Sequence, residues 1–156
     1  WNFTYRQGKN LMARINIWRD KKNEKTVTLI GDSKMFKNNA EFLTFCAHYG
    51  VHLKKKKKVK DRGPEINATS FKDYLKDVYI ISLQDNKDIK ALYDDVECFK
   101  IFEEYANGGL TEIHKLVNKN LHKDDTGVET LSKTIQDLRN KIKSVKDDGI
   151  IDLPEI

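Results

Sequence analysis

The sequence has few of the residues that mark several protein classes. Two cysteines among 156 residues are too few for the disulfide framework of a small secreted domain. The apolar runs are only a few residues long, far below the roughly 18 that a membrane span needs, and the N-terminus has no signal-peptide pattern. We therefore expect a cytoplasmic protein without membrane association, in which Cys46 and Cys98 are buried thiols. Because the chain begins at Trp1 without a methionine, we also expect a fragment or a trimmed chain.

The chain does contain charge and enough large apolar side chains to fold. Charged residues make up 34% and hydrophobic residues 38% of the sequence, and this length suits one core with an appended helix. We predict a mainly α fold, a compact helical domain with a small N-terminal β element and a C-terminal amphipathic helix. The expected divisions are residues 1–33, a basic segment with a β-hairpin; residues 34–120, the helical core; and residues 121–156, a linker and heptad-like helix.

Hydrophobic periodicity places the individual elements. Alternating apolar and polar residues in 14–30 predict a hairpin, with a short helix over 20–30 as the alternative. Spacings of three and four predict helices over residues 40–49, 71–83, 88–106, 110–120 and 128–146. We expect Asn107, Gly108 and Gly109 to end the helix over 88–106, and residues 54–69 to form a solvated loop. In the helix before those glycines, Phe102 is assigned to the core and Glu103 to solvent.

Positive charge is concentrated in one short segment. Residues 51–62 contain seven basic side chains and one acidic side chain, a local charge of +6, whereas the whole chain carries +5. Such asymmetry indicates a polyanionic partner, because a basic patch attracts polyanions while an acidic remainder limits unspecific binding. A solvated loop without a partner is the alternative.

We favour nucleic acid, since lysines that contact phosphates release condensed counterions and bind without regard to sequence. Lysines in a loop position the backbone and do not by themselves read bases. The candidate nucleic-acid-binding residues are Lys54, Lys55, Lys56, Lys57, Lys58, Lys60 and Arg62, together with Lys34, Lys37, Arg14 and Arg19.

A stripe of aliphatic residues predicts a binding surface on the last helix. Its members alternate at steps of three and four, as in a coiled coil of nearly three heptads. Three surfaces could pack against the stripe: a second copy of the chain, the chain's own domain, or another protein. The stripe consists of Val128, Leu131, Ile135, Leu138, Ile142 and Val145, of which Leu131, Ile135, Leu138 and Ile142 are the candidate partner-binding residues.

Two groups of residues resemble chemical sites but are better explained as structural. Cys46, His48 and His52 have a spacing that could hold zinc, but Gly50 intervenes and no second ligand pair follows. A nuclease would place its carboxylates on adjacent strand ends, whereas Asp94, Asp95, Glu97 and Lys100 fall on one predicted helix. No phosphate-binding glycine loop or hydrolase elbow is present. We predict no catalytic residue, no metal and no cofactor.

Two strings in the sequence resemble a known family. They are FKNNAEFLTFCAHYG at residues 36–50, followed by a basic stretch and a Gly-Pro-x-Ile turn, and IFEEYANGGL at residues 101–110. Over roughly residues 20–120 the chain resembles the DNA phosphorothioation-associated protein 4 family, whose members are encoded beside bacterial genes that place sulfur in the DNA backbone and restrict unmodified invading DNA. The resemblance implies antiviral defence and a double-stranded DNA partner, and it implies no catalytic residues.

The leading hypothesis is a non-enzymatic accessory subunit that binds DNA phosphates through the lysine-rich segment and contacts other subunits of a defence complex. A protein adaptor, whose lysines meet an acidic protein, is the second hypothesis. A metal-dependent nuclease ranks below both. A homodimer through the last helix fits either of the first two.

Overall fold

The computed structural model describes residues 12–147 and contains, within them, five α-helices, three 3-10 helices and one two-stranded sheet. In chain order the elements are β1 (Asn16–Asp20), η1 (Lys21–Asn23), α2 (Glu24–Asp32), α3 (Asn39–His52), β2 (Arg62–Asn67), η2 (Ala68–Tyr74), α4 (Leu75–Asn86), η3 (Ile89–Tyr93), α5 (Asp95–Asn120) and α6 (Val128–Asp147). The predicted mainly α fold, with a small β element near the N-terminus and a C-terminal helix, is confirmed. Predictions for residues 1–11 and 148–156, and for the Val145 side chain, lie outside the described residues.

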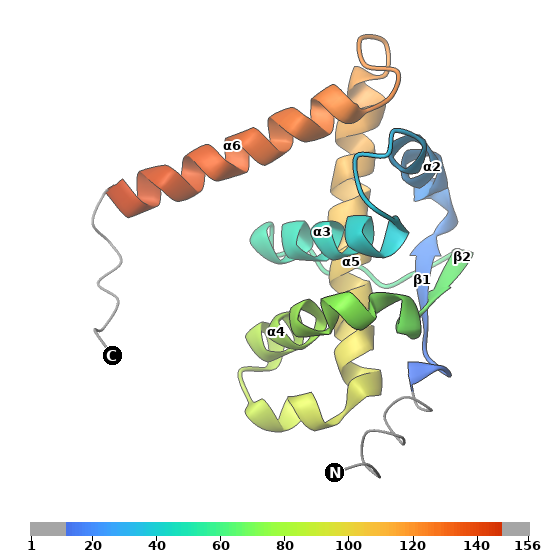
Figure 1. The fold of residues 1–156 in the computed structure, drawn as a ribbon, viewed down its shortest axis with the longest axis vertical. Coiled ribbons are helices and arrows are strands. Elements are labelled where there is room, and N and C mark those ends of the chain that lie inside the picture. The colour runs from blue at the N-terminus through green and yellow to red at the C-terminus, as the bar shows by residue number, and fades with distance from the viewer. Residues whose placement is uncertain (1–11, 148–156) are drawn as a thin grey trace.

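The long helix α5 forms the axis of the fold. Figure 1 shows α3 and α4 crossing it at different heights, with β1 and β2 on one side. Three fully buried phenylalanines, Phe71, Phe99 and Phe102, meet at edge-to-face angles beside it, with ring centroids 5.2–6.5 Å apart. Such aromatic contacts contribute beyond the burial of area alone. The core is thus organised around α5, which is buried on all sides over residues 106–111.

The prediction that Asn107 and the two glycines end this helix is wrong, because α5 continues through them to Asn120. A Cβ atom on Gly109 would overlap the carbonyl of Cys46 in α3, and one on Gly108 would overlap the carbonyl of Lys55. Gly50 makes the reciprocal contact on α3, where a Cβ would overlap the carbonyl of Tyr105. The glycines therefore serve close approach of backbones rather than chain reversal.

The predicted N-terminal hairpin is wrong in its second strand. β1 pairs antiparallel with β2, so that Ile17 lies opposite Ile66, and the residues expected to return as a strand form α2 instead. The buried residues Asn23, Val27 and Ile30 recur at spacings of four and three, the helical period. The alternative helix over 20–30 is nearer to the structure. The expected loop over 54–69 includes the whole of β2.

Two helix boundaries also differ from prediction. The helix expected over 71–83 is divided into η2 and α4, and α4 continues to Asn86, where Lys87 adopts a left-handed φ of 55°. The helix expected from residue 88 begins at Asp95, preceded by η3. Asp94 caps α5 because its side chain accepts a hydrogen bond from the Glu97 amide. Asp88, at the expected start, caps η3 instead.

The last helix leaves the body of the fold as an arm, as Figure 1 shows. Leu131 is 1% exposed and belongs to the core, whereas Ile142 is 57% exposed. The turn before α6 is fixed by Asp124, whose carboxylate accepts the Thr130 amide at 2.8 Å. The first turns of α6 are therefore attached and its outer half extends beyond them.

Candidate nucleic-acid interface

Residues 54–60, here called the lysine segment, lie in extended contact with α5. The Lys55 amide donates to the Gly50 carbonyl at 2.8 Å, and the Lys57 amide donates to the Glu104 carbonyl at 2.9 Å. The carbonyl of Lys55 rests on Gly108 at the surface of α5. The backbone of the segment is thus fixed by the fold, although its composition predicts a mobile loop.

The far end of the segment is held by a buried carboxylate. Asp20 is 2% exposed, and its Oδ1 accepts the amides of Lys60 at 2.9 Å and Asp61 at 3.1 Å. Asn107 of α5 in turn accepts the Asp20 amide and donates to the Trp18 carbonyl. These hydrogen bonds join β1, the lysine segment and α5 into one connected unit.

Lys56 is neutralised by carboxylates of the protein. Its Nζ lies 2.9 Å from Asp85 and 3.4 Å from Glu104, and 5.3 Å from the centre of the Tyr105 ring. Burial alone would lower the pKa of Lys56, but the two carboxylates raise it overall. The charge of Lys56 is therefore engaged within the domain.

Four other lysines of the segment present their charge to solvent. Their side chains are exposed, and none has a carboxylate partner among the residues that the structure describes; they are Lys54, Lys55, Lys58 and Lys60. At the end of the row, the exposed Arg62 guanidinium stacks over the Trp18 ring, 4.9 Å from its centre. This row of cations on a fixed backbone is the core of the candidate interface.

The remaining predicted basic residues divide into exposed and buried ones. Arg14, Lys34 and Lys37 are exposed, and the last two line a cavity of about 340 Å³ between α2 and α3. Arg19 is 3% exposed and pairs with Glu24 at 3.0 Å. Its assignment to the exposed basic surface therefore needs correction: Arg19 fixes β1 against α2, since its side chain is turned into the protein.

The structure places two basic residues that the sequence analysis missed, Lys22 and Lys115, near the predicted Lys57. Lys57 Nζ points to the opposite side from Lys56, where it lies 3.9 Å from Asp20 and 3.4 Å from the hydroxyl of Thr111. The adjacent Lys22 ammonium and burial lower the pKa of Lys57, and Lys115 acts in the same direction while Asp20 opposes them. Lys22, Lys57 and Lys115 are distant in sequence, so no local pattern could have united them.

The residues considered for metal chemistry have structural partners. Asp95 accepts the Tyr79 hydroxyl at 2.9 Å, and Glu97 pairs with Lys100 at 3.1 Å. His48 lies 2.8 Å from Asp77 on the surface between α3 and α4, and Cys46 is buried. Within residues 12–147 no group of three or more His, Cys, Asp or Glu is placed to hold a metal ion. No helix in the same range is long and apolar enough to cross a membrane.

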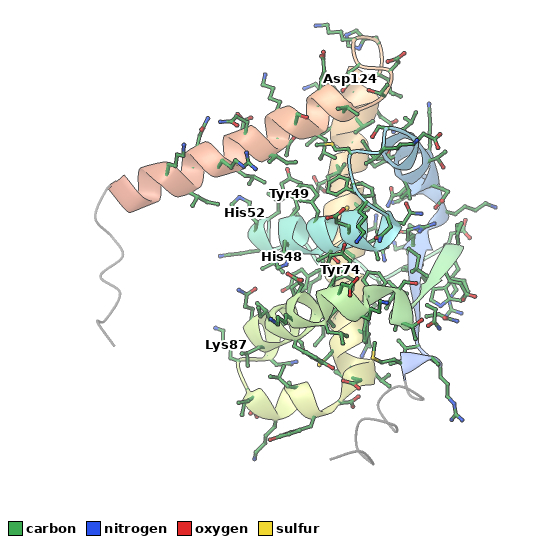
Figure 2. All side chains as sticks on the ribbon, in the orientation of Figure 1. His48, Tyr49, His52, Tyr74, Lys87 and Asp124 are labelled. Atoms are coloured by element: carbon green, nitrogen blue, oxygen red, sulfur yellow. The ribbon has the colours of Figure 1, made fainter. Side chains whose placement is uncertain are left out.

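The predicted partner stripe on α6 changes its surroundings along the helix. Leu131 is buried in the chain's own core, which removes it from the accessible partner-binding set, and Ile135 packs partly against that core. Leu138 lines a cavity of about 230 Å³ with Tyr49 and His52, two residues that Figure 2 shows on the end of α3 nearest to α6. Only the outer part of the stripe is therefore open.

Comparison with known proteins gives one family. The family model of DNA sulphur modification system-associated protein 4 matches residues 14–148, a longer range than the two sequence strings cover. No curated protein and no solved structure matches the chain. The family is associated with a DNA sulphur modification system, and the match extends over the crossing of α3, the lysine segment and α5. This chain therefore belongs to the DNA sulphur modification system-associated protein 4 family.

Proposed function

We propose that this chain is a non-enzymatic, cytoplasmic accessory subunit that brings the DNA sulphur modification system into contact with double-stranded DNA, and that it serves antiviral restriction of unmodified DNA. The lysine segment binds backbone phosphates. Other subunits of the system are its protein partners. This role agrees with the family and gives the exposed cations a polyanionic ligand.

The observation that carries the proposal is the division of the lysine segment. Lys56 is neutralised by Asp85 and Glu104, while Lys54, Lys58 and Lys60 are exposed on a backbone tied to α5. A fixed row of cations loses less conformational freedom on binding than a flexible loop. The segment is therefore suited to a regular array of phosphates.

The test is a series of duplex-binding measurements at several salt concentrations, with sulphur-modified and unmodified DNA of the same sequence. Replacing Lys54, Lys55, Lys58 and Lys60 together by Gln should weaken binding to all duplexes. The slope of log affinity against log salt should become shallower by about 0.9 for each phosphate that a lysine no longer neutralises. Lys56→Gln is the matched control within the same segment.

The control should leave the salt slope unchanged and lower thermal stability, because it orphans two carboxylates. Wild-type protein that does not bind duplex DNA at low salt would contradict the proposed function. An equal slope change for the quadruple variant and for Lys56→Gln would contradict the division into presented and anchored lysines.

A protein adaptor is the second candidate, favoured by apolar side chains exposed at the surface. Ile142 on the outer half of α6 is 57% exposed, and Tyr93 on η3 is 86% exposed. Side chains of this kind leave apolar area that a partner could bury. If α6 pairs with a second copy, Ile142→Asp should convert a dimer to a monomer in sedimentation without lowering the melting temperature. A wild-type monomer would exclude the homodimer.

A further inference from the structure

The exposed large apolar side chains of the described residues gather in two places. Ile142 lies on the outer half of α6, the arm, and is 57% exposed. The other group lies between α4 and the start of α5 and is called here the η3 face; it consists of Ile80, Leu83, Ile89, Tyr93 and Val96. Single exposed apolar residues are ordinary, whereas a contiguous group at a protein surface marks an interaction site.

Two hydrogen bonds join the elements that carry the η3 face. The Tyr79 hydroxyl of α4 donates to Asp95 at the start of α5, at 2.9 Å. The Cys98 thiol of α5 donates to the Ala91 carbonyl of η3, at 3.3 Å. Leu83 lies one turn beyond Tyr79, on the same side of α4. These elements therefore present their exposed apolar side chains on adjoining parts of the surface.

The surroundings of the η3 face are acidic. Residues 88–100 contain four acidic and two basic side chains, a local charge of −2. Two of these acidic residues, Asp88 and Asp94, are exposed. Each is fixed by one carboxylate oxygen, which caps the helix that follows it. A partner of this face should therefore combine apolar and basic side chains, because complementary charge favours the correct partner.

The outer half of α6 has this combination. Residues 138–143 contain three basic residues and no acidic one, a local charge of +3. These residues, Arg139, Lys141 and Lys143, are exposed and flank Ile142. An amphipathic helix can bind by laying its apolar stripe on an apolar surface, with flanking charges that fix its orientation. The arm and the η3 face thus complement each other in apolar character and in charge.

The arm cannot reach the η3 face of its own chain. Figure 1 shows α6 and the turn after α4 at opposite ends of α5. Val117 of α5 packs near Gly127 in the turn before α6, and from Val117 back to Val96 the helix extends about 32 Å, at about 1.5 Å per residue. From the buried Leu131 to Ile142 the arm extends about 16 Å by the same rise. The η3 face that an arm contacts must belong to another molecule.

We infer that the outer half of α6 docks on the η3 face of a second copy of this chain. The contact is head-to-tail, since it joins two different surfaces and each copy carries one of each. Its repetition builds a closed ring or an open row of copies. The inference goes beyond the proposed function and is independent of it, because its test uses the protein without DNA.

The test is sedimentation of the full chain and two variants at rising concentration. Ile142→Asp removes the apolar contact of the arm, and Tyr93→Lys places a cation on the η3 face. The wild type should associate, and each variant alone should associate about tenfold more weakly or less, as at an interface hot spot. Mixed in equal amounts, the variants should form a complex of two copies, because one keeps an intact face and the other an intact arm.

Two control variants introduce the same charges elsewhere. Asn140→Asp changes an exposed residue on the side of α6 away from Ile142. Thr28→Lys changes an exposed residue of α2. Both should associate like the wild type. Circular dichroism melting establishes that all four variants are folded, and since every replaced side chain is exposed, their melting temperatures should match that of the dilute wild type.

The other outcomes overturn the inference. A wild-type chain that stays monomeric over the whole concentration range lacks the contact. If Tyr93→Lys associates like the wild type and Ile142→Asp does not, the arm pairs with a second arm; the reverse result would indicate pairing of two η3 faces. A mixture that stays monomeric, or controls as weak as the variants, would also contradict head-to-tail docking. DNA binding by the lysine segment stands or fails by the duplex measurements alone.

Discussion

The middle of α5 and the outer arm of α6 are both helical, yet the protein holds them by different means. At the middle of α5, Gly108 and Gly109 admit the backbones of the lysine segment and α3, and Asn107 bonds to β1. The arm is attached through side chains of its first turns, chiefly Leu131, and through the cap at Asp124. Side-chain packing follows a periodic pattern, whereas backbone approach does not.

This difference decides what each region can tolerate. Substitution on the arm changes the surroundings of one side chain, and its effect should follow the burial of that side chain. Substitution at the middle of α5 acts on three neighbouring segments together, including the one that presents the exposed lysines. The proposed binding surface and the core are therefore coupled through α5 but not through the outer half of α6.

The largest expected effect is at the centre of α5. Phe102→Ala should lower the free energy of unfolding by about 3–5 kcal/mol, because the ring is fully buried against Phe71 and Phe99. Glu103→Ala should lower it by about 1–3 kcal/mol, since it leaves the Trp18 amide without its acceptor. Urea denaturation measures both. A negligible change in the free energy of unfolding for Glu103→Ala would instead support the solvent-facing position that the sequence predicts for Glu103.

On α6 the expected effect falls along the stripe. Leu131→Ala should destabilise by about 2–5 kcal/mol because Leu131 is part of the core. Ile142→Ala should stay within about 0.5 kcal/mol, as for an exposed position. The pair is compared by thermal melting of the isolated chain. Equal shifts would mean that the outer arm is covered in solution.

Alanine substitutions at two glycines are expected to change the stability of the protein in opposite directions. Gly109→Ala should destabilise by about 1–3 kcal/mol because its methyl group meets the Cys46 carbonyl. Gly31→Ala, at an exposed helical position with only an ordinary contact to Asn39, should stabilise by up to about 1 kcal/mol through helix propensity. Denaturant midpoints at constant slope measure both changes. A stabilised Gly109→Ala would show that the helices can separate at this crossing.

The contrast between the two regions also explains how much of the fold the sequence predicts. The mainly α class and the helix containing Phe42 and Leu43 follow from apolar spacing, and their side chains are buried as expected. The continuity of α5 could not be predicted, because local preference favours a helix end at Gly108 and Gly109 and only the crossing segments overrule it. The partner of β1 was missed for a similar reason, since β2 is polar and short.

The candidate site was predicted in composition but not in arrangement. A run of lysines signals a polyanion, yet nothing in it separates Lys56, which meets Asp85, from Lys58, which is exposed. Alternation along an extended segment separates Lys56 from Lys57 but places Lys56 and Lys58 on the same side. The division therefore depends on Asp85 and Glu104, which only the fold brings to Lys56. Lys22 and Lys115 required the fold itself.

The smallest predicted effect concerns pH and contrasts the two regions directly. At the turn before α6, burial would raise the pKa of Asp124, but hydrogen bonds from Thr130, Thr126 and Gly127 lower it overall. Its carboxylate therefore adds stability above the pKa of the unfolded chain, about 3.9, and this stability disappears as pH falls through the lower folded value. Asp124→Asn should be destabilising at pH 7, and its difference from wild type should shrink on acidification.

At the middle of α5 the sign is reversed. Burial raises the pKa of Glu103, with Glu104 acting in the same direction against the Trp18 amide and Arg62. The protonated form is thus favoured in the folded state, and stability declines as pH rises from the unfolded value, about 4.3, through the higher folded one. Glu103→Gln, which can still accept the Trp18 amide, should be stabilising at pH 7, and this gain should vanish toward pH 3. Urea denaturation of the wild type and of both variants between pH 3 and 7 measures the two trends. If both variants were more stable than the wild type at pH 7, or both less stable, the electrostatic contrast between the turn before α6 and the middle of α5 would be contradicted.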